Sequence, residues 1–480
     1  MTPKDSESVI LGGFSIMGES LDAGVVEAIR GAFSGRLLLK DDDDYDTTRR
    51  IFNGLIDKRP GLIAQCANAA DVATAIGFAR STGLEIAVRG GGHSVAGRST
   101  TDGGVMIDLS RMKRIDVDPE TRTARAQGGV TWGEFDGRTA KHGLATTGGT
   151  ISTTGIAGLT LGGGFGYLAG SCGLTADNLI SAELVTANGD VLSVNDADHE
   201  DLLWALRGAG ANFGVATSLE YRLHPVEQVV GGVIVYPVEA AGDVLRHYRE
   251  FTADASDELS ALAGLGHAPD GSGTPVAVVL VAHSGDAAEA DLKPLVDFGS
   301  PMMVEVGPMP YPTINTILDE AYPAGSLNYW KSSFLRELDD PAVDTMVETF
   351  ASCPSPMTAF AMEHFHGAAT RVGVSDTAVP HREQGYNYLL TSVWMDPARS
   401  DENIAWTREA YAAMEPHFAQ RRYVNYLSDD DGGASGQTIY GENYGRLRAL
   451  KARYDPDNVF RLNQNIEPAA GPAPSGDVAR

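Results

Sequence analysis

The chain has 480 residues, of which 43% are hydrophobic and 21% are charged. This composition is typical of a globular protein, and the length favours two domains over a single core. Asp and Glu number 64 against 37 Lys and Arg, which gives a formal net charge of −27. Such a surface repels phosphate backbones and anionic lipids, and no apolar run reaches the roughly 18 residues of a membrane span. We therefore expect an acidic protein with neither a nucleic-acid nor a membrane partner.

The cysteines and the N-terminus bear on the compartment. Cys66, Cys172 and Cys353 are far apart and odd in number, without the spacing of a metal site or a disulfide framework. Residues 1–10 contain no basic stretch ahead of an apolar core, so no signal peptide is predicted. A cytoplasmic location is expected.

A strand–helix–strand unit is predicted near residue 60. Leu62 and Ile63 suggest a short strand, and apolar residues at 72, 75, 76 and 79 share one face of a helix. Asn68 is expected to cap this helix and Gly83 to end it. The apolar residues 84–88 then predict a buried strand.

Directly after that strand come Arg89, Gly90, Gly91, Gly92, His93 and Ser94. Without side chains, glycine backbone N–H groups can close around an anion such as a pyrophosphate. The adjacent imidazole would then lie next to whatever the phosphates carry. From this segment alone, a glycine-rich turn with a surface histidine is an equal alternative.

A second glycine-rich segment covers residues 148–166. A stable helix is not expected there, because each glycine costs about 1 kcal/mol relative to alanine. Small residues in this number indicate backbone packed closely on a ligand or on other backbone. The alternative, a flexible linker, is opposed by the apolar residues Ile151, Ile156, Leu159, Leu161 and Phe165 within it.

Strands are expected at 174–185, 189–194 and 215–223, with a helix at 201–206. The glycine-rich residues 208–214 follow a helix and precede a strand, which is the reverse of the order in a Rossmann nucleotide site. They therefore give little support to a nicotinamide cofactor. Glycine thins out after His224 and Pro225, and residues 227–421 are predicted to form an antiparallel α+β domain, with a strand at 276–282 and a helix at 342–350.

Four motifs occur in one order along the chain. They are residues 89–94, residues 154–166 (Thr-Gly-Ile-Ala-Gly-Leu-Thr-Leu-Gly-Gly-Gly-Phe-Gly), residues 173–179 (Gly-Leu-Thr-Ala-Asp-Asn-Leu) and residues 454–460 (Tyr-Asp-Pro-Asp-Asn-Val-Phe). With these motifs the chain resembles the berberine-bridge-enzyme-like FAD-linked oxidases of the vanillyl-alcohol-oxidase group, from residue 59 to residue 466.

The resemblance implies an α+β fold. A PCMH-type FAD-binding domain of two α/β subdomains would span residues 1–226, and a substrate domain with an antiparallel sheet and flanking helices would span 227–421. Residues 422–468 would return to the FAD domain. Independently of the resemblance, the Pro-, Gly- and Ala-rich composition of the last residues predicts a flexible tail at 469–480.

The resemblance also implies that FAD is bonded covalently to His93 through its 8-methyl group. Many relatives form a second bond from a cysteine at the position that Ile151 occupies here, so a single covalent bond is predicted. The residues expected around the cofactor are His93, Arg89, Gly90, Gly91, Gly92, Ser94, Gly148, Gly149, Thr153, Thr154, Gly155, Gly158, Gly162, Gly163, Phe165, Gly166, Asn212, Val215, Asn425 and Asn463.

Hydride transfer from an alcohol is easier when the hydroxyl group is being deprotonated, so a base is expected near the flavin. Residues 423–426 suggest a strand, which would place Tyr423 and Asn425 on one face and Tyr426 on the other. The resemblance places this segment against the flavin ring. One of the two tyrosines is expected to act as base or orienting donor; the alternative is that both only pack and hydrogen-bond.

A second catalytic candidate is the segment Glu363-His364-Phe365-His366. On a strand His364 and His366 share one face and Glu363 lies on the other. The resemblance places this strand in the substrate-facing sheet, so Glu363 or His364 is expected to contact substrate, with solvent-facing polar residues as the alternative. A zinc site would need a third ligand that the sequence does not show, so no metal is predicted.

The leading hypothesis is a covalent FAD oxidase that takes a hydride from an alcohol, sugar or secondary metabolite and passes the electrons to O2. Thr154 aligns with a family residue that controls access of oxygen and is neither of its usual aliphatic choices. A dehydrogenase with another acceptor is therefore the close alternative. A flavin-binding protein without turnover is the hypothesis from a different class.

Overall fold

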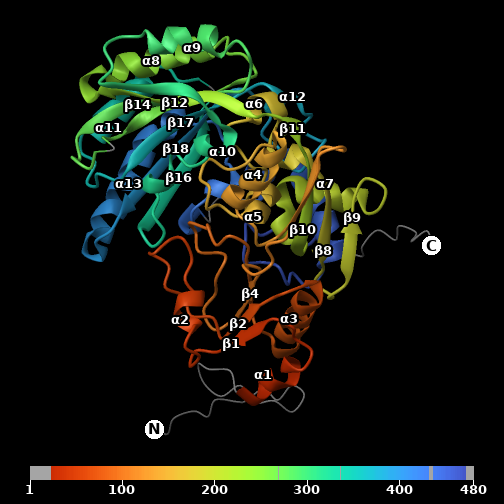
Figure 1. Cartoon of the computed structure of the whole chain (residues 1–480). Helices are drawn as coiled ribbons and strands as arrows, with labels where there is room; N and C mark the ends of the chain where they lie inside the picture. The colour runs from red at the N-terminus through yellow and green to blue at the C-terminus, as the bar shows by residue number, and fades with distance from the viewer. Residues whose placement is uncertain (1–22, 269, 336, 432–435, 472–480) are drawn as a thin grey trace, which may run out of the picture.

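The computed structural model describes residues 23–268, 270–335, 337–431 and 436–471. Helices and strands are mixed, as the predicted α+β class requires. A four-stranded sheet lies at one end of the molecule, a seven-stranded sheet at the other, and a five-stranded sheet between them (Figure 1). The predicted tail lies outside the described residues from 472 onward, as does the N-terminal segment 1–10.

The four-stranded sheet has the order β1-β2-β4-β3 and is parallel except for β1. Its strands are β1 (Arg36–Leu38), β2 (Leu62–Gln65), β3 (Ile86–Arg89) and β4 (Val105–Asp108). Helix α3 (Ala69–Thr82) connects β2 to β3. As predicted, the Asn68 side chain accepts a hydrogen bond from the Asp71 N–H, and Gly83 ends the helix with φ of +70°. Strand β3 therefore delivers the first glycine segment at its C-terminal end.

The five-stranded sheet is antiparallel, with the order β5-β6-β10-β8-β9. Its strands are β5 (Ile115–Asp118), β6 (Thr123–Gln127), β8 (Leu179–Val185), β9 (Val191–Val194) and β10 (Val215–Arg222), and the helices near it are α4 (Trp132–Thr139), α5 (Ile156–Leu161) and α7 (Glu200–Ala209). A two-stranded pair, β7 (Leu144–Ala145) with β11 (His224–Pro225), lies beside it.

Two sequence predictions in this region are wrong. The second glycine segment contains a helix, α5, because Ile156 and Leu161 are buried in the core and this packing outweighs the poor intrinsic propensity of glycine. The predicted strand from 174 begins only at Leu179, because residues Thr175–Asn178 form a 3₁₀ turn.

The seven-stranded antiparallel sheet has the order β15-β12-β14-β13-β17-β18-β16. Its strands are β12 (Gln228–Pro237), β13 (Leu259–His267), β14 (Pro275–His283), β15 (Met303–Pro310), β16 (Leu327–Leu335), β17 (Ala359–Phe365) and β18 (Gly385–Trp394). Helices on one face bury its apolar residues; they are α8 (Ala241–Thr252), α9 (Ala288–Val296), α11 (Asp340–Phe350) and α13 (Ser400–Met414).

The other face of this sheet points toward the two glycine segments. On β18, Tyr388 and Leu390 pack against the helices, whereas Leu389 and Thr391 face the opposite side. This alternation follows from the pleat of a strand. The other α-helices before residue 422 are short; they are α1 (Ala23–Arg30), α2 (Tyr45–Thr48), α6 (Ala169–Cys172), α10 (Tyr311–Ile314) and α12 (Ala368–Arg371).

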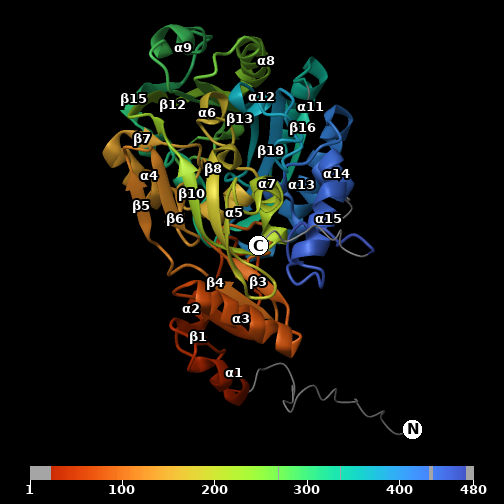
Figure 2. The same cartoon turned by 90° about the vertical axis from the view of Figure 1, so that its right-hand side faces the viewer.

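After the seven-stranded sheet the chain returns to the core beside the five-stranded sheet through α14 (Gly436–Tyr440) and α15 (Tyr444–Tyr454), and α15 packs against α7 (Figure 2). Lys451 is fully buried here. Its ammonium donates to the Asp455 carboxylate at 2.7 Å, the Asn212 carbonyl at 2.7 Å and the Phe460 carbonyl at 2.9 Å. These contacts fix the last segment against the residues that precede β10. The domain boundaries at 226 and 421 stay predictions.

Candidate active site

A cavity of about 330 Å³ lies where the two glycine segments, the face of the seven-stranded sheet and the returning C-terminal segment meet. Most of the residues predicted to surround a cofactor line it. They are Gly90, Gly91, Gly92, His93, Ser94, Gly149, Thr154, Gly155, Gly158, Gly162, Phe165, Asn212, Val215, Asn425 and Asn463. The chain thus brings together predicted residues as distant in sequence as Gly90 and Asn463.

The two glycine segments touch each other directly. A Cβ atom on Gly91 would lie 2.5 Å from the backbone N of Gly155, and one on Gly155 would lie 2.3 Å from the N of Gly91. Both distances are far below van der Waals contact. Only glycine fits at either position, and the wall of the cavity is therefore formed by backbone.

His93 lies at the end of the first glycine segment, and its ring stacks on Phe52 with a centroid distance of 3.8 Å and an interplanar angle of 16°. Its Nε2 atom is buried and has no hydrogen-bond partner among the described residues. Burial lowers the pKa of the imidazole to about 4, so the ring is neutral at physiological pH. A neutral imidazole has a free nitrogen lone pair and can act as a nucleophile.

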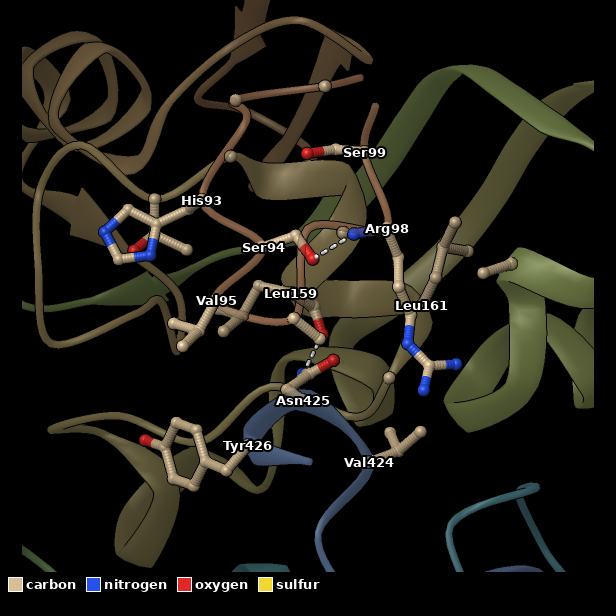
Figure 3. A pocket seen from close by; sticks show the side chains of 18 of the residues that line it. His93, Ser94, Val95, Arg98, Ser99, Leu159, Leu161, Val424, Asn425 and Tyr426 are labelled. Carbon is tan, nitrogen blue, oxygen red and sulfur yellow. Dashed lines mark hydrogen bonds between the residues drawn. The ribbon is translucent and has the colours of Figure 1, made fainter. Parts of the chain in front are cut away.

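The C-terminal segment forms the opposite wall of the cavity. Figure 3 shows Val424, Asn425 and Tyr426 on one side and Ser94 and Arg98 on the other. Residues Val424–Tyr426 form a 3₁₀ helix and not the predicted strand. The expected two-faced arrangement is therefore wrong: Val424, Asn425 and Tyr426 all line the cavity.

Tyr423 does not line the cavity. Its hydroxyl oxygen accepts hydrogen bonds from the N–H groups of Gly164 at 2.9 Å and Phe165 at 3.1 Å, and from the Asn425 side-chain amide at 2.9 Å. Burial raises the pKa of Tyr423 to about 12, although these donors oppose the rise. The hydroxyl group therefore stays protonated and holds the glycine turn in place.

Glu363 on β17 is an acidic residue in the lining of the cavity, and its exposed fraction is only 2%. The Asn387 side chain, directly across on β18, donates to its Oε2 at 2.5 Å, and the Tyr426 hydroxyl donates to its Oε1 at 3.1 Å. Burial raises the pKa of Glu363 to about 7, and these two hydrogen bonds limit the rise. A carboxyl group that titrates near neutrality is suited to acid–base catalysis.

His364 points to the other face of the sheet, as the strand alternation predicts. It stacks on His366 with a centroid distance of 4.2 Å and lines a separate surface hollow near Tyr386. Burial lowers the pKa of His364 to about 3.

Within the described ranges, no three His, Cys, Asp or Glu side chains are grouped as metal ligands. None of the helices in the described part of the chain has the length and hydropathy of a membrane span.

The remaining predicted residues support the cavity from behind. The Arg89 guanidinium donates to the buried Asp108 carboxylate at 2.6 and 2.9 Å, which anchors the end of β3. Gly166 packs on Gly148, where a Cβ would lie 1.6 Å from the Gly148 carbonyl oxygen. Also outside the lining are Thr153 and Gly163.

Several cavity residues were not predicted. Arg98 and Ser99 belong to the same segment as His93, and their proximity in sequence could have indicated them. Trp330, Tyr322 and Leu389 come from distant strands and loops, and no local pattern marks them. Residues 208–214, given little weight because of their order, supply Gly208, Ala209, Ala211 and Gly214 to the lining in addition to the predicted Asn212.

A backbone-walled cavity with a neutral imidazole whose Nε2 has no partner among the described residues fits a flavin nucleotide, because backbone N–H groups suit a diphosphate and the imidazole suits attachment to the ring. This fold and site define a flavin-linked oxidoreductase.

Comparison with known proteins agrees with that class. A family model described as an FAD binding domain matches residues 60–195, and one described as berberine and berberine like matches residues 422–467. An FAD-linked oxidoreductase of Dictyostelium discoideum is 31% identical, covering 92% of this chain and 97% of the relative. The (R)-6-hydroxynicotine oxidase of Paenarthrobacter nicotinovorans is also 31% identical, over 91% of this chain and 97% of its own.

Solved structures show the same fold. The 6-hydroxy-D-nicotine oxidase of Arthrobacter nicotinovorans superimposes with a TM-score of 0.84 at 30% identity, over 91% of this chain and 98% of that chain. A chitooligosaccharide oxidase superimposes with a TM-score of 0.83 at 25% identity, over 93% and 100%. This chain belongs to the berberine-bridge-enzyme-like FAD-linked oxidoreductases.

Proposed function

We propose that this enzyme carries FAD bonded covalently to His93, takes a hydride from a small organic substrate and passes the electrons to molecular oxygen, giving hydrogen peroxide. One observation carries the proposal: a single cavity contains both the glycine wall with His93 and the buried carboxyl of Glu363. The first suits attachment of the cofactor, and the second suits proton removal from the substrate.

The state of His93 supports covalent attachment. Its imidazole is neutral, and its Nε2 atom has no hydrogen-bond partner among the described residues. Ile151 also lines the cavity and has no nucleophilic atom, which supports a single bond. Cys172, which lies outside the lining, has a thiol whose pKa is raised by burial. Its sulfur is therefore not an activated second attachment point.

Glu363 is the proposed base. In its ionised form it can accept the proton of a substrate hydroxyl or amine while hydride leaves the adjacent carbon, and bound FAD supplies the hydride acceptor. The hydrogen bonds from Asn387 and Tyr426 stabilise the carboxylate and hold its orientation. Tyr426 can also orient the substrate, since its hydroxyl lines the same end of the cavity.

The walls around Glu363 favour a mainly apolar secondary metabolite over an oligosaccharide. Leu262, Leu318, Trp330 and Leu389 line the same cavity. The hydroxyl group of Thr391 is already hydrogen-bonded to the Tyr322 hydroxyl at 2.9 Å. A sugar needs several free hydrogen-bonding partners, and a buried hydroxyl without one costs a few kcal/mol. A relative at 31% identity is named for oxidation of a hydroxynicotine, a compound of the favoured kind.

Thr154 bears on which electron acceptor reoxidises the flavin. It lines the cavity at the position that the family resemblance connects with access of oxygen to the flavin. Because Thr154 is neither of the family's usual aliphatic residues at this position, a dehydrogenase that transfers electrons to another acceptor is the second candidate.

Two measurements test the proposal. Denatured protein must keep its flavin absorbance in the polypeptide fraction, and His93→Ala must lose it. Anaerobic mixing with a panel of aromatic amines, aromatic alcohols and oligosaccharides must bleach the flavin with at least one apolar member. Bleaching by oligosaccharides alone would overturn the substrate class, and bleaching by none would favour a flavin-binding protein without turnover. Reoxidation by oxygen in a stopped-flow instrument then separates oxidase from dehydrogenase.

A further inference from the structure

We propose that Phe52 is a positioning residue for flavin attachment: its ring holds the imidazole of His93 in the plane from which the bond to the 8-methyl group of FAD forms. The inference rests on the proposed covalent bond. Phe52 precedes the segment that the FAD-binding family model matches, which begins at residue 60.

The backbone around Phe52 is fixed on both sides. The Phe52 N–H donates to the Gly92 carbonyl at 2.9 Å, so the residue is tied to the glycine next to His93. The adjacent Asn53 side chain donates to the Val95 carbonyl at 2.7 Å and to the Asn328 carbonyl at 2.8 Å. Residues 52 and 53 are therefore tied both to the first glycine segment and to strand β16.

The side-chain contacts of Phe52 constrain the imidazole. Phe52 is 7% exposed and covers one face of the His93 ring at 3.8 Å. Its own position is limited by Trp330, which meets it edge-on at a centroid distance of 6.5 Å and an angle of 75°. Nε2 of His93 has no hydrogen-bond partner among the described residues, whereas the imidazole makes a hydrogen bond to the backbone of His93 itself. Stacking on Phe52 and this local hydrogen bond together set the ring plane.

The orientation of the ring matters for the chemistry of attachment. The new bond joins an imidazole nitrogen to the 8-methyl carbon, and it replaces one C–H bond of the methyl group and the N–H bond of the imidazole. The two electrons released stay on the flavin ring, which is reduced together with the two protons. Molecular oxygen, the proposed acceptor, then reoxidises the ring and leaves as hydrogen peroxide. Attack on a single carbon needs an aligned nucleophile, and a displacement of about 1 Å can slow such a step about a hundredfold.

The test follows covalent incorporation in time. Full-length protein is produced under riboflavin limitation, mixed with FAD in air, and sampled into acid; the covalent fraction is read from flavin fluorescence in denaturing gels and from the protein mass. For Phe52→Leu we expect attachment at least about tenfold slower than in wild type, with an unchanged dissociation constant for FAD before attachment. Phe52→Trp, which keeps an aromatic face, should recover most of the rate.

Phe350→Leu is the matched control. Phe350 is 3% exposed and lies in the core of the seven-stranded sheet on α11, away from the cavity lining, so the variant loses a similar aromatic ring and should attach FAD at the wild-type rate. Equal rates in Phe52→Leu and wild type would overturn the inference, as would a Phe52→Trp variant as slow as Phe52→Leu. If wild type itself forms no covalent product, the proposed bond to His93 fails instead. Melting temperatures and FAD affinity separate a folding defect from a loss of alignment.

Discussion

Replacing Glu363 with glutamine tests the base at the substrate end of the cavity. Gln is close to Glu in shape and can still accept a hydrogen bond from Asn387, so the walls should keep their positions. What is lost is the ability to take a proton. Removal of a general base typically slows a reaction by about 10²- to 10⁴-fold, and we expect flavin reduction in Glu363→Gln to slow within this range.

The pH dependence of the rate of flavin reduction is a second quantity that tests the role of Glu363. Because burial raises the pKa of Glu363 to about 7, about one-tenth of the carboxyl groups are ionised at pH 6 and about nine-tenths at pH 8. The base is the ionised form, so the rate of flavin reduction in wild type should rise about tenfold between these two pH values. In Glu363→Gln this rise should disappear.

The assay is anaerobic stopped-flow reduction of the bound flavin at substrate concentrations well below saturation at pH 6, 7 and 8, because this regime reports the pKa of the substrate-free enzyme. A control for the charge change is Glu250→Gln on α8, which is exposed and should behave like wild type. The covalent flavin content should be equal in all three proteins. If Glu363→Gln reduces its flavin at the wild-type rate, or keeps the tenfold rise, Glu363 is not the base.

Three further predictions concern stability and cofactor binding. Burial raises the pKa of Asp136 from 3.8 to about 7, so the wild type loses stability as the pH rises from about 4 to 7. At pH 8 the free energy of unfolding of Asp136→Asn should exceed that of wild type by up to about 4 kcal/mol, and near pH 4 the two free energies should be equal; calorimetry at both pH values measures this. Gly91→Ala places a Cβ 2.5 Å from Gly155, and we expect purified protein without flavin absorbance. Tyr423→Phe leaves Asn425 and two backbone N–H groups without their acceptor, and chemical unfolding should show a loss of about 1–3 kcal/mol with the pH profile of catalysis unchanged.

The sequence was most informative where a local rule decides the structure. Asn68 and Gly83 mark the two ends of α3 because a cap and a left-handed turn need those residue types. The alternation of a strand correctly separated Glu363 from His364, and the family motifs located the glycine wall with His93.

The sequence was least informative where distant packing decides. Helix α5 forms in a glycine-rich segment because Ile156 and Leu161 reach a core that residues far away supply. The 3₁₀ helix Val424–Tyr426 turns three successive side chains into one cavity, which no two-residue period predicts. The partner of Glu363, Asn387, lies across a strand pairing whose register only the folded sheet defines.

The cavity is closed by residues from the last part of the chain, including Val424–Tyr426 and Leu462–Gln464, which face a wall built near residue 90. During synthesis on the ribosome, a growing chain that has emerged only as far as the seven-stranded sheet still lacks this side of the enclosure. Secure loading of the cofactor must therefore wait until residues 424–464 have been synthesised. A stop codon that removes residues after 422 should yield a protein that is never yellow, even though every glycine of the wall and the histidine beside it are present.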